Sequence, residues 1–169
     1  MLYRNRMEHR DVPIAHRAGR VEDAPTLARM ARDYIEDGLR WTWRPRRIQQ
    51  AIRDRNTRVL VAEAPRGSGT EIAGFAIMRF EDENAHLSLL AVHPFYRRRR
   101  IARDLLKRLE TAARTAGIGE IRLEVRTGND AALEFYRQLG YRAVLRLPGY
   151  YGGRESAFRM ARALTVKAE

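Results

Sequence analysis

The sequence predicts a mixed α/β domain, with a mostly antiparallel central sheet of about six to seven strands and helices on both faces. Helix-spaced and strand-spaced apolar patterns alternate along the chain in the order β-α-α-β-β-β-α-β-α-β-β. The strand–helix–strand segment within residues 86–126 requires a right-handed parallel crossover. Short polar turns elsewhere join neighbouring strands into antiparallel hairpins. These two connection types together define the mixed sheet.

Each element follows from a local pattern. Apolar residues from Leu27 to Ile35 recur at helical spacing after a cap at Asp23, and Pro45 opens a second short helix. Residues 120–126 alternate strictly between apolar and charged side chains, as expected for a strand. The expected strands are residues 14–18, 57–64, 71–80, 85–92, 120–126, 141–147 and 155–163. The two later helices are residues 101–116 and 130–139, ended by Gly117 and Gly140.

The composition restricts the class of protein. The chain has 169 residues, no cysteine and a formal net charge of +12, carried almost entirely by arginine. The lack of cysteine excludes disulfides, thiolate metal sites and cysteine nucleophiles. The charge favours anionic partners, but the basic residues are spread along the chain, which argues against a nucleic-acid-binding protein.

The chain reads as one domain. We expect residues 1–12 to be a flexible tail and residues 13–169 to form a single folded unit. No apolar run is long enough to span a bilayer, and the N-terminus lacks the apolar segment of a secretory signal. We therefore expect a cytoplasmic protein without a membrane partner.

The stretch His86–Ala102 joins a strand to a helix through a turn that carries four successive arginines. The first N–H groups of a helix have no intrahelical acceptor, and with the helix dipole they attract anions. Four arginines at this positive helix end are unfavourable unless an anion binds there. The turn therefore predicts a phosphate site, as against a solvated basic surface.

Two motifs resemble the GNAT family of N-acetyltransferases. The run LAVHPFYRRRRIARDLL is similar to the family's acetyl-CoA motif, Gln/Arg-x-x-Gly-x-Gly/Ala, with Arg97 first and Ala102 last. The run LEVRTGNDAALEFYRQLGY resembles the second motif, and HRAGRVEDAPTLARM the usual first strand and helix. The resemblance implies the GNAT fold over roughly residues 14–163 and acetyl-CoA as acetyl donor, with no metal.

The resemblance also implies coenzyme contacts. They fall on the strand end, the turn and the residue before the later helix: Leu90, Ala91, Val92, Arg97, Arg98, Arg99, Arg100, Ile101, Ala102, Arg103 and Asn129. Arg100 departs from the family pattern, which has glycine there. Its side chain either contacts a phosphate or obstructs the coenzyme.

Direct acyl transfer to an amine needs a base, oxyanion donors and an acid for the leaving thiolate. By resemblance to the N-terminal-amine acetyltransferases of the family, Glu124 is the base and Tyr136 the acid, with structural roles as the alternatives. Tyr150 and Tyr151 would line the acceptor's entrance. Trp41, with Trp43, would either form the opposite wall or anchor its loop to the core. His9, His16 and His86 lack metal-ligand spacing.

We therefore expect an acetyl-CoA-dependent N-acetyltransferase acting on a primary amine, with a protein or peptide N-terminus as the first hypothesis. One alternative is a small-molecule amine as acceptor. Another is a non-catalytic binding module of the same fold, in which Arg100 blocks the coenzyme. The sequence leaves a homodimer open and does not identify the acceptor.

Overall fold

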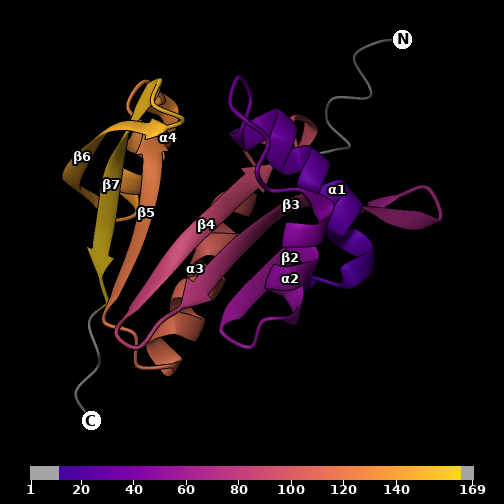
Figure 1. Ribbon diagram of the computed structural model, residues 1–169. Helices are drawn as coiled ribbons and strands as arrows, with labels where there is room; N and C mark the ends of the chain where they lie inside the picture. The colour runs from indigo at the N-terminus through magenta and orange to yellow at the C-terminus, as the bar shows by residue number, and fades with distance from the viewer. Residues whose placement is uncertain (1–11, 165–169) are drawn as a thin grey trace.

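The computed structural model describes residues 12–164, which form a seven-stranded sheet in the order β1-β2-β3-β4-β5-β7-β6 (Figure 1). Every neighbouring pair is antiparallel except β4 and β5, which are parallel. The strands are β1 (Ala15–Ala18), β2 (Thr57–Arg66), β3 (Gly69–Phe80), β4 (Asn84–Val92), β5 (Glu120–Arg126), β6 (Arg142–Tyr151) and β7 (Glu155–Ala163). The predicted mixed sheet and its parallel crossover are confirmed.

Helices cover both faces of the sheet, as predicted (Figure 1). The α-helices are α1 (Ala24–Met30), α2 (Pro45–Arg53), α3 (Ile101–Thr115) and α4 (Asp130–Gln138). One core cluster joins α1 and α2 to the sheet, and a second joins α3 and α4 to its other face. Within β3, Phe75 and Ile77 belong to the first cluster, whereas Ala76 and Met78 belong to the second. Burial of both faces explains why β3 is apolar at consecutive positions.

The parallel strands β4 and β5 stay paired only at their beginnings. The paired residues are Asn84 to His86 with Glu120 to Arg122, and beyond them the two strands diverge (Figure 1). A β-bulge accompanies the divergence: Met78 pairs with Leu87 and Ile77 with Leu89, so Ser88 has no direct cross-strand partner. The second half of β4 therefore presents an unpaired edge toward β5.

Two elements differ from the expectation. The helix expected to continue through Ile35 ends in a π-helical turn, Ala31–Ile35, closed by the Glu36 N–H donating to the Ala31 carbonyl. Tyr150 and Tyr151, expected in a loop, lie at the end of β6, because Tyr151 pairs with Glu155 of β7. The predicted flexible tail lies outside the described residues, apart from Val12.

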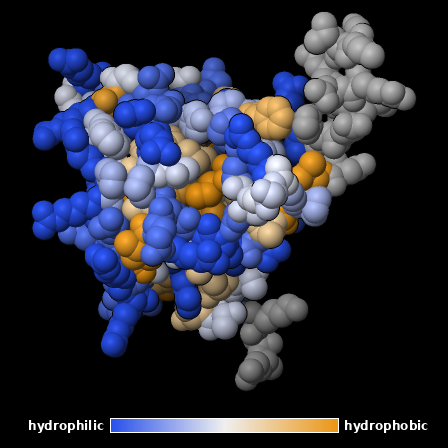
Figure 2. All heavy atoms as spheres, turned by 90° about the vertical axis from the view of Figure 1, so that its right-hand side faces the viewer, coloured by the Kyte–Doolittle hydropathy of each residue, from blue (hydrophilic) through white to orange (hydrophobic). Residues whose placement is uncertain are grey.

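The described surface is strongly polar. Figure 2 shows hydrophilic residues distributed over the face it presents, with smaller hydrophobic areas between them. Within residues 12–164, no helix combines the length and apolar character needed to cross a bilayer. Hydrophilic side chains therefore cover this face broadly, without one large hydrophobic area.

Candidate active site

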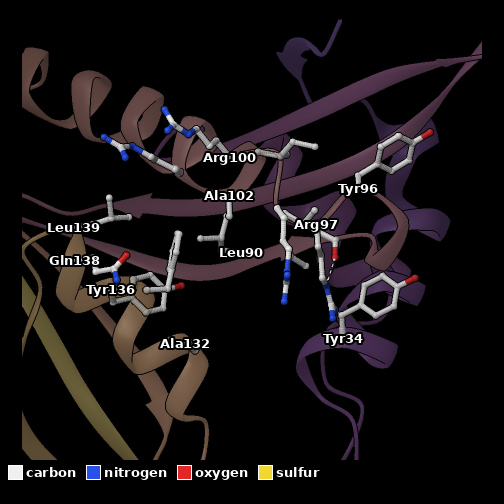
Figure 3. Close-up of a pocket in the computed structure, with 16 residues that line it drawn as sticks. Tyr34, Leu90, Tyr96, Arg97, Arg100, Ala102, Ala132, Tyr136, Gln138 and Leu139 are labelled. Carbon is white, nitrogen blue, oxygen red and sulfur yellow. Dashed lines mark hydrogen bonds between the residues drawn. The ribbon is translucent and has the colours of Figure 1, made fainter. Parts of the chain in front are cut away.

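A cavity of about 530 Å³, here called the turn cavity, lies between the end of β4, the start of α3 and α4 (Figure 3). Its lining contains most residues predicted to contact a coenzyme: Leu90, Ala91, Val92, Arg97, Arg98, Arg100, Ile101, Ala102 and Arg103. Tyr34, Tyr96, Ala132, Phe135, Tyr136, Gln138 and Leu139 complete the lining. Arg99 and Asn129 are not among the lining residues.

The backbone of the turn is shaped to receive an anion. Arg98 and Arg100 both adopt the left-handed conformation, with φ of 63° and 61°. Among residues 12–164, no acceptor takes a hydrogen bond from the backbone N–H groups of residues 98–103, whereas the Asp104 N–H donates to the Arg100 carbonyl. Six successive donors at a helix N-terminus form an anion-binding concavity. Arg100 thus adopts the backbone conformation that a glycine would favour.

The arginines of the turn point in different directions. Arg97 donates from Nε to the Val92 carbonyl at 3.4 Å, and its guanidinium lies 5.9 Å from the Tyr34 ring centroid (Figure 3). Arg99 instead lies over the Tyr96 ring at 5.2 Å, outside the cavity lining. The turn cavity therefore receives charge from Arg97, Arg98, Arg100 and Arg103.

A second and larger cavity of about 1370 Å³, here called the cleft cavity, lies on the side of α1 and α2 where β4 and β5 diverge. Side chains from β4, β5, the β6–β7 hairpin and the α1–α2 connection line it. They include His86, Ser88, Glu124, Tyr150, Tyr151 and Trp43. The divergence of the parallel strands therefore opens the cavity.

Glu124 is buried on the wall of the cleft cavity, with 8% of its side chain exposed. It accepts hydrogen bonds from Arg159 at 3.0 Å and pairs with His86 Nε2 at 2.6 Å. Burial alone would raise the pKa of the carboxyl, but the bonds from His86 and Arg159 outweigh it, so the pKa is lowered. Glu124 is therefore an anion held by two partners.

Tyr136 lies where the two cavities meet. Among residues 12–164, only Tyr34, Leu90, Ala132 and Tyr136 line both cavities. Figure 3 shows Tyr136 from α4 and Leu90 from β4 on facing sides of the turn cavity. Burial raises the pKa of the Tyr136 hydroxyl, so the group stays protonated near neutral pH. The hydroxyl is therefore available as a proton donor.

The remaining predicted site residues lie around the cleft cavity. Asn129 lines it and caps α4, accepting from the Ala132 N–H at 3.1 Å. Tyr150 and Tyr151 line it as an edge-to-face pair with ring centroids 4.9 Å apart. Trp41 is not among the lining residues; its indole donates to the Trp43 carbonyl at 3.1 Å, and Trp43 lines the wall.

Sequence reasoning missed three residues that shape this cavity. His86 and Ser88 stand beside Glu124 on the wall. Glu36 is buried and accepts hydrogen bonds from the Thr42 and Trp43 N–H groups, which orders the connection between α1 and α2. Helical spacing drew attention to the apolar residues before Glu36, and a buried carboxylate in a loop has no comparable pattern.

The part of the chain that the structure describes contains no group of three His, Asp or Glu side chains placed to hold a metal ion. The site instead combines an anion-binding turn, an open strand edge, a tyrosine where the two cavities meet and a carboxylate on the wall of the cleft cavity. In a mixed sheet with one diverging parallel pair, this combination is suited to acyl transfer from a coenzyme.

Residues 25–141 match the family model described as the acetyltransferase (GNAT) family, and the chain belongs to that family. It is therefore an acetyl-CoA-dependent N-acetyltransferase, as the two sequence motifs predicted. The matched range contains both motifs and every residue at the junction of the two cavities.

Two curated relatives and one solved structure place the chain within the family. It is 34% identical over 99 residues to the ribosomal protein bS18-alanine N-acetyltransferase of Escherichia coli strain K12, covering 57% of this chain and 67% of that protein. It is 31% identical over 114 residues to NAA20, catalytic subunit of the N-terminal acetyltransferase B complex of Arabidopsis thaliana, covering 64% of each. Arabidopsis thaliana NAA60, solved with acetyl-CoA, has the same fold, with a TM-score of 0.78, 19% identity and coverage of 90% and 99%.

Proposed function

We propose that this acetyltransferase moves the acetyl group of acetyl-CoA to the α-amine of a protein or peptide N-terminus. The observation that carries the proposal is that the turn cavity and the cleft cavity meet at Tyr136. A donor in the first cavity and an acceptor in the second would bring their reacting atoms together there.

The turn supports the donor side of the proposal. The pyrophosphate of acetyl-CoA would accept hydrogen bonds from the backbone N–H groups of residues 98–103, with Arg97, Arg98, Arg100 and Arg103 supplying positive charge. The pantetheine arm would lie along the unpaired edge of β4 at residues 90–92. An N–H group of that edge would stabilise the oxyanion.

Two side chains on the wall of the cleft cavity, Glu124 and Tyr136, support direct transfer. In this proposal Glu124 and the side chains bonded to it accept the amine's proton, and Tyr136 protonates the departing thiolate. No covalent enzyme intermediate and no metal are part of the proposed route. The left-handed backbone of Arg100 keeps the turn intact, which counts against the non-catalytic module.

The relatives support the acceptor. One is named for acetylation of the alanine of ribosomal protein bS18, and another is the catalytic subunit of an N-terminal acetyltransferase complex. The cleft cavity, at about 1370 Å³, has room for the first residues of a peptide and exceeds what a small amine requires. Tyr150, Tyr151 and the Trp41–Trp43 loop would border the entering chain.

Further parts of the proposal concern the whole chain. We propose residues 13–169 as one catalytic domain acting in the cytoplasm, with residues 1–12 as a flexible tail. Asn129 contacts the coenzyme in this proposal through the amide group that caps α4. A homodimer is compatible with the proposed activity and is not required by it.

Replacing Tyr136 with Phe tests the proposal. Removing a general acid should lower kcat by about 100-fold while leaving acetyl-CoA affinity nearly unchanged. Release of CoA can be followed with a thiol reagent, because the chain has no cysteine. Acetyl-CoA at a hundredfold over its Kd should stabilise the wild type by about 2.7 kcal/mol.

A control separates donor binding from chemistry. Arg137→Lys changes an exposed neighbour on α4 that lines neither cavity, and it should retain the full rate. Absence of any thermal shift with acetyl-CoA, or full activity of Tyr136→Phe, would contradict the proposed site. Transfer to polyamines or antibiotics with none to peptides would reassign the acceptor.

A further inference from the structure

A continuous hydrogen-bonded row crosses the wall of the cleft cavity. Ser88 Oγ lies 3.2 Å from His86 Nδ1, and His86 Nε2 lies 2.6 Å from Glu124 Oε2. Arg159 contacts the other oxygen of Glu124 at 3.0 Å. All three residues of the row line the cavity proposed for the acceptor. The row joins a hydroxyl, an imidazole and a carboxylate in that order.

The partners determine the direction of each hydrogen bond. An ionised carboxylate only accepts, so the proton of a neutral imidazole lies on Nε2 and points to Glu124. Nδ1 then carries the lone pair, and the Ser88 hydroxyl donates to it. The lowered pKa of Glu124 agrees with the ionised state. In this arrangement the Ser88 oxygen is free to accept a proton while it gives up its own.

The bulge in β4 places Ser88 close to the proposed thioester site. Ser88 lacks a direct cross-strand partner, and Leu90, which lines both cavities, follows two residues later. Two residues of a strand span roughly 7 Å. An amine in contact with Ser88 Oγ would therefore lie within reach of a thioester carbonyl held beside Leu90.

We propose that Ser88, His86 and Glu124 form a proton relay, in which Ser88 contacts the acceptor amine, His86 takes the proton and Glu124 positions the imidazole. The inference rests on the proposed function and specifies its base. Glu124 thereby acts through His86 and not as the atom that receives the proton.

The relay accounts for every proton that moves during acetyl transfer. The neutral amine nitrogen forms a bond to the thioester carbon, and the carbonyl electrons move to oxygen. The amine's proton passes to Ser88 Oγ as the Ser88 proton passes to His86 Nδ1. The carbonyl re-forms, the C–S bond breaks, and Tyr136 protonates the thiolate. The imidazolium then returns its proton through solvent to the Tyr136 oxygen.

Charged and titratable groups surround His86 in the sheet and across the cleft. Arg79 of β3 and Arg122 of β5 are its neighbours in the sheet, and each is bonded to a glutamate, Glu81 or Glu120. Arg159 of β7, Tyr150 of β6, and Arg47 and Asp54 of α2 and its end also border the cleft or Glu124. Among these groups, Glu124 contacts the imidazole directly and stabilises the positive charge that His86 carries during the transfer.

Nitrogen-15 NMR of the imidazoles tests the relay on the intact enzyme, without an acceptor. The chain has four histidines, and comparison with His86→Gln assigns the signal. At a pH where His86 is neutral, the relay requires the Nε2–H tautomer. A dominant Nδ1–H tautomer would overturn it, whether or not the enzyme acetylates N-termini.

Steady-state kinetics of variants provide a second test of the relay. With any amine that the wild type acetylates, His86→Ala and Ser88→Ala should each lower kcat by about 100-fold, with KM for acetyl-CoA changed by less than about twofold. Added imidazole should restore part of the rate of His86→Ala and none of that of Tyr136→Phe. Ser68→Ala, exposed in the β2–β3 turn, is the matched control and should retain full activity.

Other outcomes identify other mechanisms. Wild-type rates for His86→Ala would show that Glu124 works alone through water, and loss without imidazole rescue would reduce His86 to a structural partner. An acetyl adduct on Ser88 by intact mass would show a covalent route; each of these results rejects the relay. If no peptide is acetylated, the proposed acceptor fails, while the NMR result still decides the relay.

Discussion

At the scale of single residues, Arg100 shows how a motif can lose its glycine and keep its shape. The residue adopts φ of 61° at the N-cap of α3, in the left-handed region. For a residue with a Cβ this conformation costs about 1–2 kcal/mol. The strain is retained at a position where the side chain lines the turn cavity, which suggests that the guanidinium has a use there.

Arg100→Gly should therefore separate stability from affinity. Relief of the left-handed strain should raise the free energy of unfolding by about 1 kcal/mol, reduced by glycine's greater freedom in the unfolded chain. Loss of a charge-assisted phosphate contact should weaken acetyl-CoA binding by roughly tenfold. Urea unfolding and calorimetric titration measure the two effects.

Arg100→Asn is the matched variant, because asparagine tolerates the left-handed region but lacks the guanidinium. It should lose the same affinity as Arg100→Gly with little change in stability. Tighter acetyl-CoA binding by either variant would mean that Arg100 obstructs the coenzyme.

Residue-level prediction depended on whether a side chain belonged to a recognisable motif. Glu124 and Tyr136 were predicted as site residues because LEVR and the following helix resemble a known pattern, and both side chains line the cleft cavity. Ser88 was missed because its position on the cavity wall depends on the bulge in β4, which shifts the strand's register. No local pattern in the sequence marked that shift.

At the scale of elements, the bulge at Ser88 also changes which side of the sheet the apolar side chains of β4 face. Before it, Ala85 and Leu87 pack in the core beneath α3; after it, Leu89 and Ala91 pack with α1 and α2. Periodicity identified β4 as a strand but could not reveal this exchange. The sequence also predicted the parallel crossover without showing how soon β4 and β5 separate, since that depends on packing across the whole sheet.

Gly74 of β3 allows the end of β4 and the start of α3 to pack closely against β3. A Cβ there would lie 2.9 Å from the Ala91 carbonyl oxygen and 3.1 Å from Ile101 Cγ2. Gly74→Ala should therefore displace the strand end and the start of α3, costing about 1–3 kcal/mol of stability. Acetyl-CoA affinity should fall as well, because Ala91 and Ile101 line the turn cavity.

Gly69→Ala at the start of β3 is the control, because its added Cβ would come no closer than 4.0 Å to a neighbour, the Arg66 carbonyl oxygen. Chemical denaturation and coenzyme titration of both variants provide the comparison. Equal stability and affinity for the two would show that the contact at Gly74 can relax.

At the scale of the whole molecule, ion pairs join different elements of a chain whose formal net charge is +12. Arg17 bonds Asp23 at 2.7 Å near the N-terminal edge of the sheet, and Arg159 bonds Glu124 between β5 and β7. Since cations outnumber anions, protonating these carboxylates removes attraction and adds to self-repulsion. The free energy of unfolding should therefore fall strongly as the pH is lowered.

Three titratable groups determine the direction in which stability changes with pH. Burial lowers the pKa of His16 from 6.5. For Asp23 and Glu124, burial acts upward, but the bonds from Arg17 and from His86 with Arg159 outweigh it, so their pKa values are lowered from 3.8 and 4.5. In each case the unfolded chain binds the proton first, so the stabilisation is present above the unfolded pKa and is lost as pH falls through the folded pKa.

We therefore expect the free energy of unfolding to begin falling below about pH 6.5, through His16, and to fall more steeply below about pH 4.5 as Glu124 and then Asp23 take up protons. Urea unfolding at about pH 7.5, 5.5, 4 and 3 would measure the decline across this window. His16→Asn should flatten the first part and Arg17→Met the part below about pH 4, because each variant removes one source of the difference in proton binding. Constant stability down to the lowest pH would mean that these groups titrate alike in the folded and unfolded chain, and that the ion pairs contribute nothing to folding.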